Sequence, residues 1–88
     1  MGATVDGIST ILSAGLHIDR GAVREGSFSD FHWARQRHAP LRFEAHIMPS
    51  TGEPGGAGEL GVPAAAGAVA NAYARATGTK PRRFPIDF

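Results

Sequence analysis

A glycine- and proline-rich segment at residues 49–63 constrains the fold of this chain more than any other feature. It holds five glycines and three prolines around Glu53 and Glu59. Glycine weakens helices and strands because it has the most backbone freedom to lose on folding, and proline lacks the N–H that a helix interior or a central strand needs. The segment is therefore predicted to be a loop, with regular structure confined to the residues before and after it.

The residues after this loop predict a helix. Pro63 suits a first helical turn, and the alanine-rich run that follows, as far as residue 76, has high helix propensity. Arg75 would lie favourably at the negative end of the helix dipole, and Gly78 suits a C-terminal cap.

The N-terminal part predicts a second helix and a hairpin. Apolar residues recur there at intervals of three or four: Met1, Val5, Ile8, Leu12 and Leu16. That spacing indicates an amphipathic helix over roughly residues 2–14. Residues 16–18 and 22–24 flank the short sequence Asp19-Arg20-Gly21, a pattern typical of strand, tight turn and strand.

Residues 41–48 alternate between apolar and mainly polar side chains and predict a further strand. Residues 26–40 show no sustained period and are interpreted as a structured loop or an edge strand. The chain is thus expected to be a single α+β domain over residues 1–88, with two helices packed on a small sheet of three to four strands. Its order would be helix, hairpin, strand, loop, helix. Such a sheet has open edges, which favours assembly with a partner.

Size and charge limit the functions that are open to the chain. A chain of 88 residues buries only about 60–65% of its unfolded surface, so the core should be thin. The net charge of +1 argues against nucleic acid as a partner. The one basic cluster, Lys80, Arg82 and Arg83, is interpreted as a solvated tail in preference to a phosphate site.

The chain has no cysteine, so it cannot by itself hold a disulfide, a thiolate zinc site or an iron–sulfur cluster. Its longest apolar run, at residues 62–70, is too short to span a membrane, and no export signal is visible. These features predict a cytoplasmic location without a membrane span, with export in the company of a partner subunit as the alternative.

Two chemical interpretations of the glycine-rich loop are open. A phosphate-binding loop is one, since the loop leads into a helix N-terminus. It lacks the Lys-Ser/Thr pair of a P-loop, however, and its carboxylates would repel phosphate. The other interpretation is a carboxylate that a stiffened loop holds toward a ligand.

An ordered series of short motifs supports the second interpretation and spans nearly the whole chain. Around the loop these are Pro49-Ser50-Thr51, Glu53-Pro54-Gly55-Gly56, Gly58-Glu59, Pro63, Ala70-Asn71-Ala72 and Ala76-Thr77-Gly78. Upstream are Asp6-Gly7-Ile8-Ser9-Thr10 and Gly26-Ser27-Phe28-Ser29-Asp30-Phe31. The series resembles the C-terminal segment of the molybdopterin-binding subunit of molybdenum hydroxylases, the family of isoquinoline 1-oxidoreductase, aldehyde dehydrogenase and xanthine dehydrogenase.

The resemblance implies an oxidoreductase that hydroxylates aldehydes or N-heteroaromatics with water as the oxygen source. It assigns Glu59 as the general base beside the molybdenum, and Ala57 and Gly58 as backbone near the metal and pterin. The implied cofactor is molybdopterin, in the cytosine dinucleotide form, held only in complex with a larger molybdopterin-binding chain and an iron–sulfur subunit. Alone, the chain would be inactive.

Two departures from the family pattern affect this assignment. Leu60 stands where the family usually has proline, and Gly52 lengthens the approach to the loop. The family's upstream body, which supplies most pterin contacts, has no counterpart in this sequence. A stand-alone, non-catalytic, homo-oligomeric module derived from the same segment is therefore the alternative function.

Other residues carry weaker hypotheses. Glu53 is the rival carboxylate, and Glu59 by itself could be a solvated acid stabilised near a helix start by a few tenths of a kcal/mol. The four histidines at positions 17, 32, 38 and 46 lack metal-ligand spacing and suit surface or loop roles. Phe28, Phe31 and Trp33 are interpreted as packing residues, with a substrate entrance as the alternative.

Overall fold

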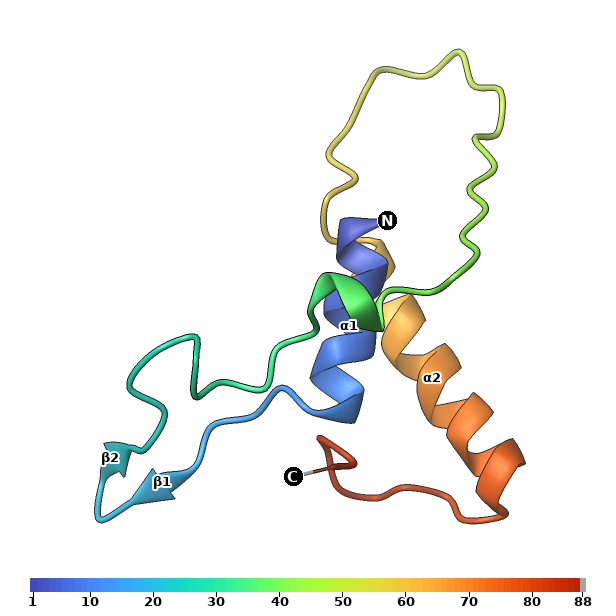
Figure 1. The fold of residues 1–88 in the computed structure, drawn as a ribbon. Helices are drawn as coiled ribbons and strands as arrows, with labels where there is room; N and C mark the ends of the chain where they lie inside the picture. Colours follow the sequence, from blue (N-terminus) through green and yellow to red (C-terminus); the bar gives the residue numbers. More distant parts are fainter. Residues whose placement is uncertain (88) are drawn as a thin grey trace.

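A computed structural model describes residues 1–87 and shows a small α+β fold (Figure 1). Its elements are helix α1 (Gly2–Leu12), strands β1 (Ile18–Asp19) and β2 (Ala22–Val23), the 3₁₀ turn η1 (Gln36–His38) and helix α2 (Gly61–Thr77). Both predicted helices are confirmed. α2 begins two residues earlier than predicted, and Gly78 ends it in a left-handed conformation with φ 73°.

The two helices pack against each other at positions that only small residues can occupy. A Cβ on Gly7 of α1 would lie 2.5 Å from the carbonyl oxygen of Val62 and 2.8 Å from Cβ of Ala65. A Cβ on Gly61, at the start of α2, would lie 3.0 Å from Cβ of Ala3. Glycine at these two positions lets the helix backbones approach closely, so the N-terminal half of α1 lies beside the N-terminal turns of α2.

The loop before η1 is joined to α1 by two hydrogen bonds that involve serine side chains of α1 and its C-cap. The Ala34 N–H donates to Oγ of Ser9 at 2.8 Å, and the Ser13 hydroxyl donates to the carbonyl of His32 at 2.9 Å. Ser9 is only 1% exposed. A buried hydroxyl without a hydrogen-bond partner is costly. The bond between Ser9 and Ala34 therefore holds the loop at this position against α1.

Ser9→Ala is therefore expected to detach this loop while leaving α1 in place. Losing the acceptor should cost about 1 kcal/mol, since the Ala34 N–H is part-buried. Hydrogen exchange at the Ala34 amide should accelerate by roughly 5-fold, which is that energy expressed as an equilibrium constant. Thr10→Ala is a matched control on the same helix, because the Thr10 hydroxyl bonds only to the exposed Asp6 carbonyl. Equal acceleration in both variants would contradict the assignment.

The C-terminal residues close the open end of α1. The N–H groups of Ile86 and Asp87 donate to the carbonyls of Ile11 and Leu12, both at 2.8 Å. These carbonyls belong to the last turn of the helix, where C=O groups have no N–H partner within the helix. Ile86 and Asp87 thus form a C-terminal clip on α1, and Ile86 is half-buried there.

The predicted hairpin is confirmed, in a shorter form. Ile18 pairs with Val23 and Asp19 with Ala22, antiparallel. Arg20 and Gly21 form the turn with φ 50° and 82°. Two consecutive positive φ angles match the right-handed twist of hairpin strands, which explains why glycine occupies the second position.

Two parts of the predicted architecture are wrong. Residues 41–48 form no strand, and the described sheet has only two strands, of two residues each. The helices pack on each other and not on this sheet: over residues 1–87, neither helix contacts the hairpin strands. Alternation specifies a strand only where a neighbouring strand is available to pair with it, and the described hairpin is too short to serve.

The fold is far more open than a self-sufficient domain of its size. The radius of gyration is 15.7 Å, against about 12 Å for a compact domain of 88 residues. No hydrophobic side chain among residues 1–87 is fully buried. Several large apolar residues are more than three-quarters exposed instead: Phe28, Leu41, Ile47 and Met48. The chain therefore gains little of the burial energy that normally stabilises a domain.

Candidate functional site

Glu59 lies at the end of a long projecting loop, directly before α2. In Figure 1 the loop runs from the green segment through its outermost turn to the yellow residues that enter α2. Glu59 is exposed, and its carbonyl accepts the Val62 N–H at 3.2 Å. This bond fixes the Glu59 backbone to the first turn of α2, which in turn is held by α1. Leu60, the N-cap residue, offers no side-chain acceptor to the helix.

Neither loop carboxylate is engaged by the rest of the chain. Over residues 1–87, the side chains of Glu53 and Glu59 make no hydrogen bond or ion pair. The two acids differ in how they are held, because Glu59 adjoins a helix and Glu53 lies among residues without regular structure. A group that must act at a defined position needs such support, so the geometry favours Glu59 over Glu53.

Ala57 and Gly58 present open backbone next to Glu59. Both are exposed, and a Cβ built on Gly58 would meet no atom within 4 Å. A ligand could therefore come close to the main chain here. One carboxylate and two open peptide units fit the edge of a large cofactor, but they cannot enclose one. The described residues also contain no group of three or more His, Cys, Asp or Glu side chains that could hold a metal ion.

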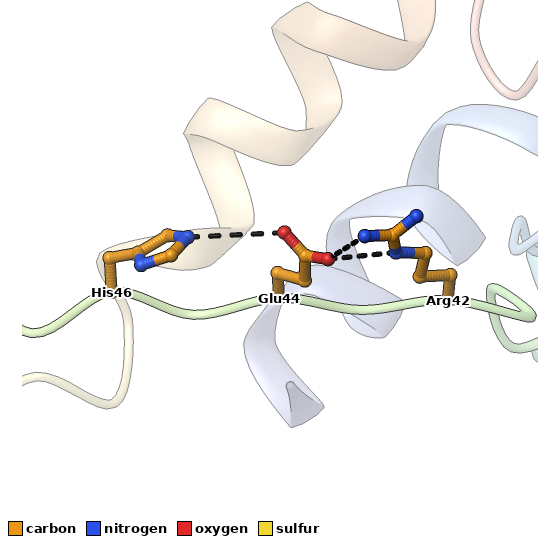
Figure 2. A network of polar contacts seen from close by, with 3 residues as sticks. All are labelled: Arg42, Glu44 and His46. Carbon is orange, nitrogen blue, oxygen red and sulfur yellow. Dashed lines mark hydrogen bonds and ion pairs between the residues drawn. The ribbon is translucent and has the colours of Figure 1, made fainter.

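Residues 41–48, which lead into the loop, carry a row of polar side chains on one side. Arg42 donates from Nε to Oε1 of Glu44 at 2.7 Å, and its Nη2 contacts the same oxygen. His46 Nε2 lies 3.9 Å from Oε2 of Glu44. Figure 2 shows the three side chains along the same side of an extended segment. The polar face expected from the alternation is therefore present, although the strand is not.

A cavity of about 710 Å³ has no lining residue from the loop that carries Glu59. It is bounded by α1, the 29–38 region, Tyr73 of α2 and the C-terminal clip. Glu59, Ala57 and Gly58 do not line it. Among residues 1–87, this cavity thus provides no enclosed site around the predicted base.

The aromatic residues of the 26–40 region divide between the cavity and the surface. Phe31 and Trp33 line the cavity, with ring centroids 5.7 Å apart. Phe28 is 81% exposed, so its interpretation as a packing residue is wrong within this chain. Burying it would require surface from another protein.

Glu25 and His17 form an acid–histidine pair at the base of the hairpin that was not predicted from the sequence. The His17 backbone N–H donates to Oε2 of Glu25 at 2.9 Å, and His17 Nδ1 contacts Oε1. The hydrogen bond from the His17 side chain, with that from its backbone, lowers the pKa of Glu25 from 4.5 to about 2. The only signal in the sequence is that a histidine lies within the first predicted strand and an acid directly follows the second.

This pair should make the stability of the hairpin depend on acid. A carboxyl with a lowered pKa stabilises the fold fully above its unfolded value of 4.5, and that contribution is lost as the pH falls toward about 2. The dispersion of the hairpin amides in NMR spectra should therefore decline between pH 4.5 and 2. Glu25→Gln is expected to remove this pH dependence, and its persistence in that variant would contradict the role of Glu25.

No helix among the described residues is long and apolar enough to cross a membrane. Comparison of the chain with models of known protein families, with curated proteins and with solved structures finds no match.

Proposed function

We propose that this chain is the C-terminal subunit or segment of a molybdenum hydroxylase and contributes Glu59 as general base to a site completed by a larger chain. The observation that carries the proposal is the display of Glu59. It lies exposed and without a side-chain partner, on a loop whose C-terminal end is held by packed helices. The resemblance of the flanking motifs to molybdenum hydroxylases is the reason for assigning the general-base role to this carboxylate.

The open structure supports a role within a larger assembly. No hydrophobic side chain is buried among the described residues, and the radius of gyration is 15.7 Å. The chain therefore lacks the hydrophobic core that stabilises an independent domain. The same chain offers exposed apolar residues on both sides of the loop, Ile47 before it and Leu60 at its end. Binding to a partner would bury these residues and hold the loop.

The cofactor would come with the partner. Molybdopterin would supply the metal that activates water and accepts the electrons removed from an aldehyde or N-heteroaromatic carbon. This chain would add the Glu59 carboxylate, which takes up a proton, and the Ala57 and Gly58 peptides, which allow close approach. A general base must be ionised and within hydrogen-bond reach of the proton it takes. The chain would therefore act mainly by holding the loop so that the Glu59 carboxylate reaches that proton.

Purification of the tagged chain from cells that naturally make it tests the proposal. We expect a larger chain, an iron–sulfur chain and molybdenum to co-purify with it in constant ratio. A metal-free homo-oligomer would overturn the proposal and support the alternative, a stand-alone non-catalytic module. Mass measurement by light scattering, with metal analysis of the same fraction, separates the two.

A further inference from the structure

Residues 41–48 form an extended segment that the rest of the chain leaves unpaired. No backbone N–H or C=O of these residues is hydrogen-bonded within the described chain. Leu41 is 108% exposed and Ile47 95%, whereas Phe43 between them is 38% exposed. In Figure 1 the segment rises away from both helices. Apolar side chains and unpaired peptide groups together mark a strand whose neighbour is absent.

The segment is organised as a strand with two distinct faces. Arg42, Glu44 and His46 lie on one side and interact with one another (Figure 2). In an extended chain, positions 41, 43, 45 and 47 then face the opposite side, and all four are apolar. Pro40 and Pro49 bound the segment, so every residue within it keeps the N–H that a strand ladder requires.

We infer that residues 41–48 add as a strand to the open sheet edge of a different, larger chain, with the 43, 45 and 47 side chains covered by that chain's apolar layer. The described hairpin cannot be the acceptor, since its strands have two residues each. Strand addition would be the way in which the partner of the proposed function is bound. Only the identity of that partner as a molybdopterin-binding chain rests on the proposed function.

Pairing of residues 41–48 with the same residues of a second copy would bury too little surface for a stable interface. Two such strands, each about 26 Å long with a contact band about 10 Å wide, would bury roughly 500 Å² in total. Stable protein interfaces bury about 1,200 Å² or more. A two-stranded ribbon is also marginal by itself and would leave its apolar face in water. An existing sheet supplies both the hydrogen-bonding edge and the covering layer.

Strand addition would also complete the support of the loop that carries Glu59. The C-terminal end of the loop is held by α2, while its N-terminal end follows directly from residue 48. Pairing of residues 41–48 would fix that second end. Charge adds specificity: the acceptor strand should place an acid opposite Arg42 and a base opposite Glu44, because like charges directly opposite destabilise a sheet.

Photo-crosslinking tests the inference in the full-length chain. Benzoylphenylalanine is placed singly at positions 44 to 47, and the tagged chain is irradiated in the cells that naturally make it. We expect strong cross-links to one larger chain from positions 45 and 47 and weak ones from 44 and 46, with the cross-linked peptides mapping to a single partner strand. No cross-link, cross-links without the two-residue period, or a product at twice the 9.2 kDa chain mass would overturn it.

Proline variants provide the matched control. Ala45→Pro removes one ladder N–H and is expected to reduce cross-linking from position 47 at least tenfold, whereas Thr51→Pro, just beyond the segment, should leave it unchanged. Helical circular dichroism of both free variants should equal that of the parent, since positions 45 and 51 lie outside both helices. Periodic cross-links to a chain without molybdenum would preserve the strand addition and refute the proposed function, so the two failures are distinguishable.

Discussion

In the proposed assembly with a molybdopterin-binding chain, replacing Glu59 with Gln is expected to lower kcat by about 10²–10⁴-fold, the usual contribution of a general base. The amide keeps the size of the side chain but cannot take up a proton. Because the Glu59 side chain makes no hydrogen bond or ion pair within residues 1–87, the free chain should fold as before. The measurement is steady-state turnover of the purified complex, with molybdenum content determined on the same sample.

Glu53→Gln is the matched control for this variant. Glu53 lies on the same loop, is also exposed and is six positions away, and its replacement removes the same carboxyl group. We expect kcat to stay at the parent value. Normal turnover in Glu59→Gln, or an equal loss in both variants, would rule out Glu59 as the base. Loss of the partner chain from the Glu59→Gln complex would show a structural role instead.

Gly7→Ala should have the largest effect on stability. The new Cβ would lie 2.5 Å from the Val62 carbonyl oxygen and 2.8 Å from Cβ of Ala65, so α1 and α2 must separate. Overpacking of this kind costs about 1–3 kcal/mol, which the better helix propensity of alanine offsets by up to about 1 kcal/mol. A net loss of about 1–2 kcal/mol corresponds to a fall in Tm of about 4–16 °C.

Gly67→Ala provides the comparison, because it makes the same chemical change inside α2. A Cβ at Gly67 would meet no atom within 4 Å, so only helix propensity changes and the variant should gain up to about 1 kcal/mol. Thermal unfolding followed by circular dichroism at 222 nm measures both variants. A gain in stability for Gly7→Ala as well would show that the helices do not pack as closely as described.

The local parts of the fold could be predicted from the sequence. Helix propensity and the Gly78 cap identified α2, apolar spacing identified α1, and the residues around Arg20 and Gly21 identified the hairpin. These signals act over a few residues, within one turn or one helix. The loop predicted at residues 49–63 was correct as far as residue 60 for the same reason, whereas residues 61–63 belong to α2. Glu59 was singled out by its neighbours in the chain.

The errors concern contacts between distant residues. Residues 41–48 have the alternation of a strand, but hydrogen-bonding partners must come from elsewhere, and the described chain supplies none. Phe28 was expected to pack and is 81% exposed. The His17–Glu25 pair has no periodicity to reveal it, because it depends on how the hairpin closes. Composition and local pattern carry no record of such long-range partners.

The sequence by itself determined where the helices, the hairpin turn and the loop would lie, since these follow from backbone preferences and short-range hydrogen bonds. Only the tertiary structure decided that α1 and α2 pack through Gly7 and Gly61, that the C-terminal residues cap α1, and that the 41–48 segment stands unpaired beside the loop carrying Glu59. The physical reason is that close packing and pairing depend on which surfaces meet in space, and chain order alone does not specify that.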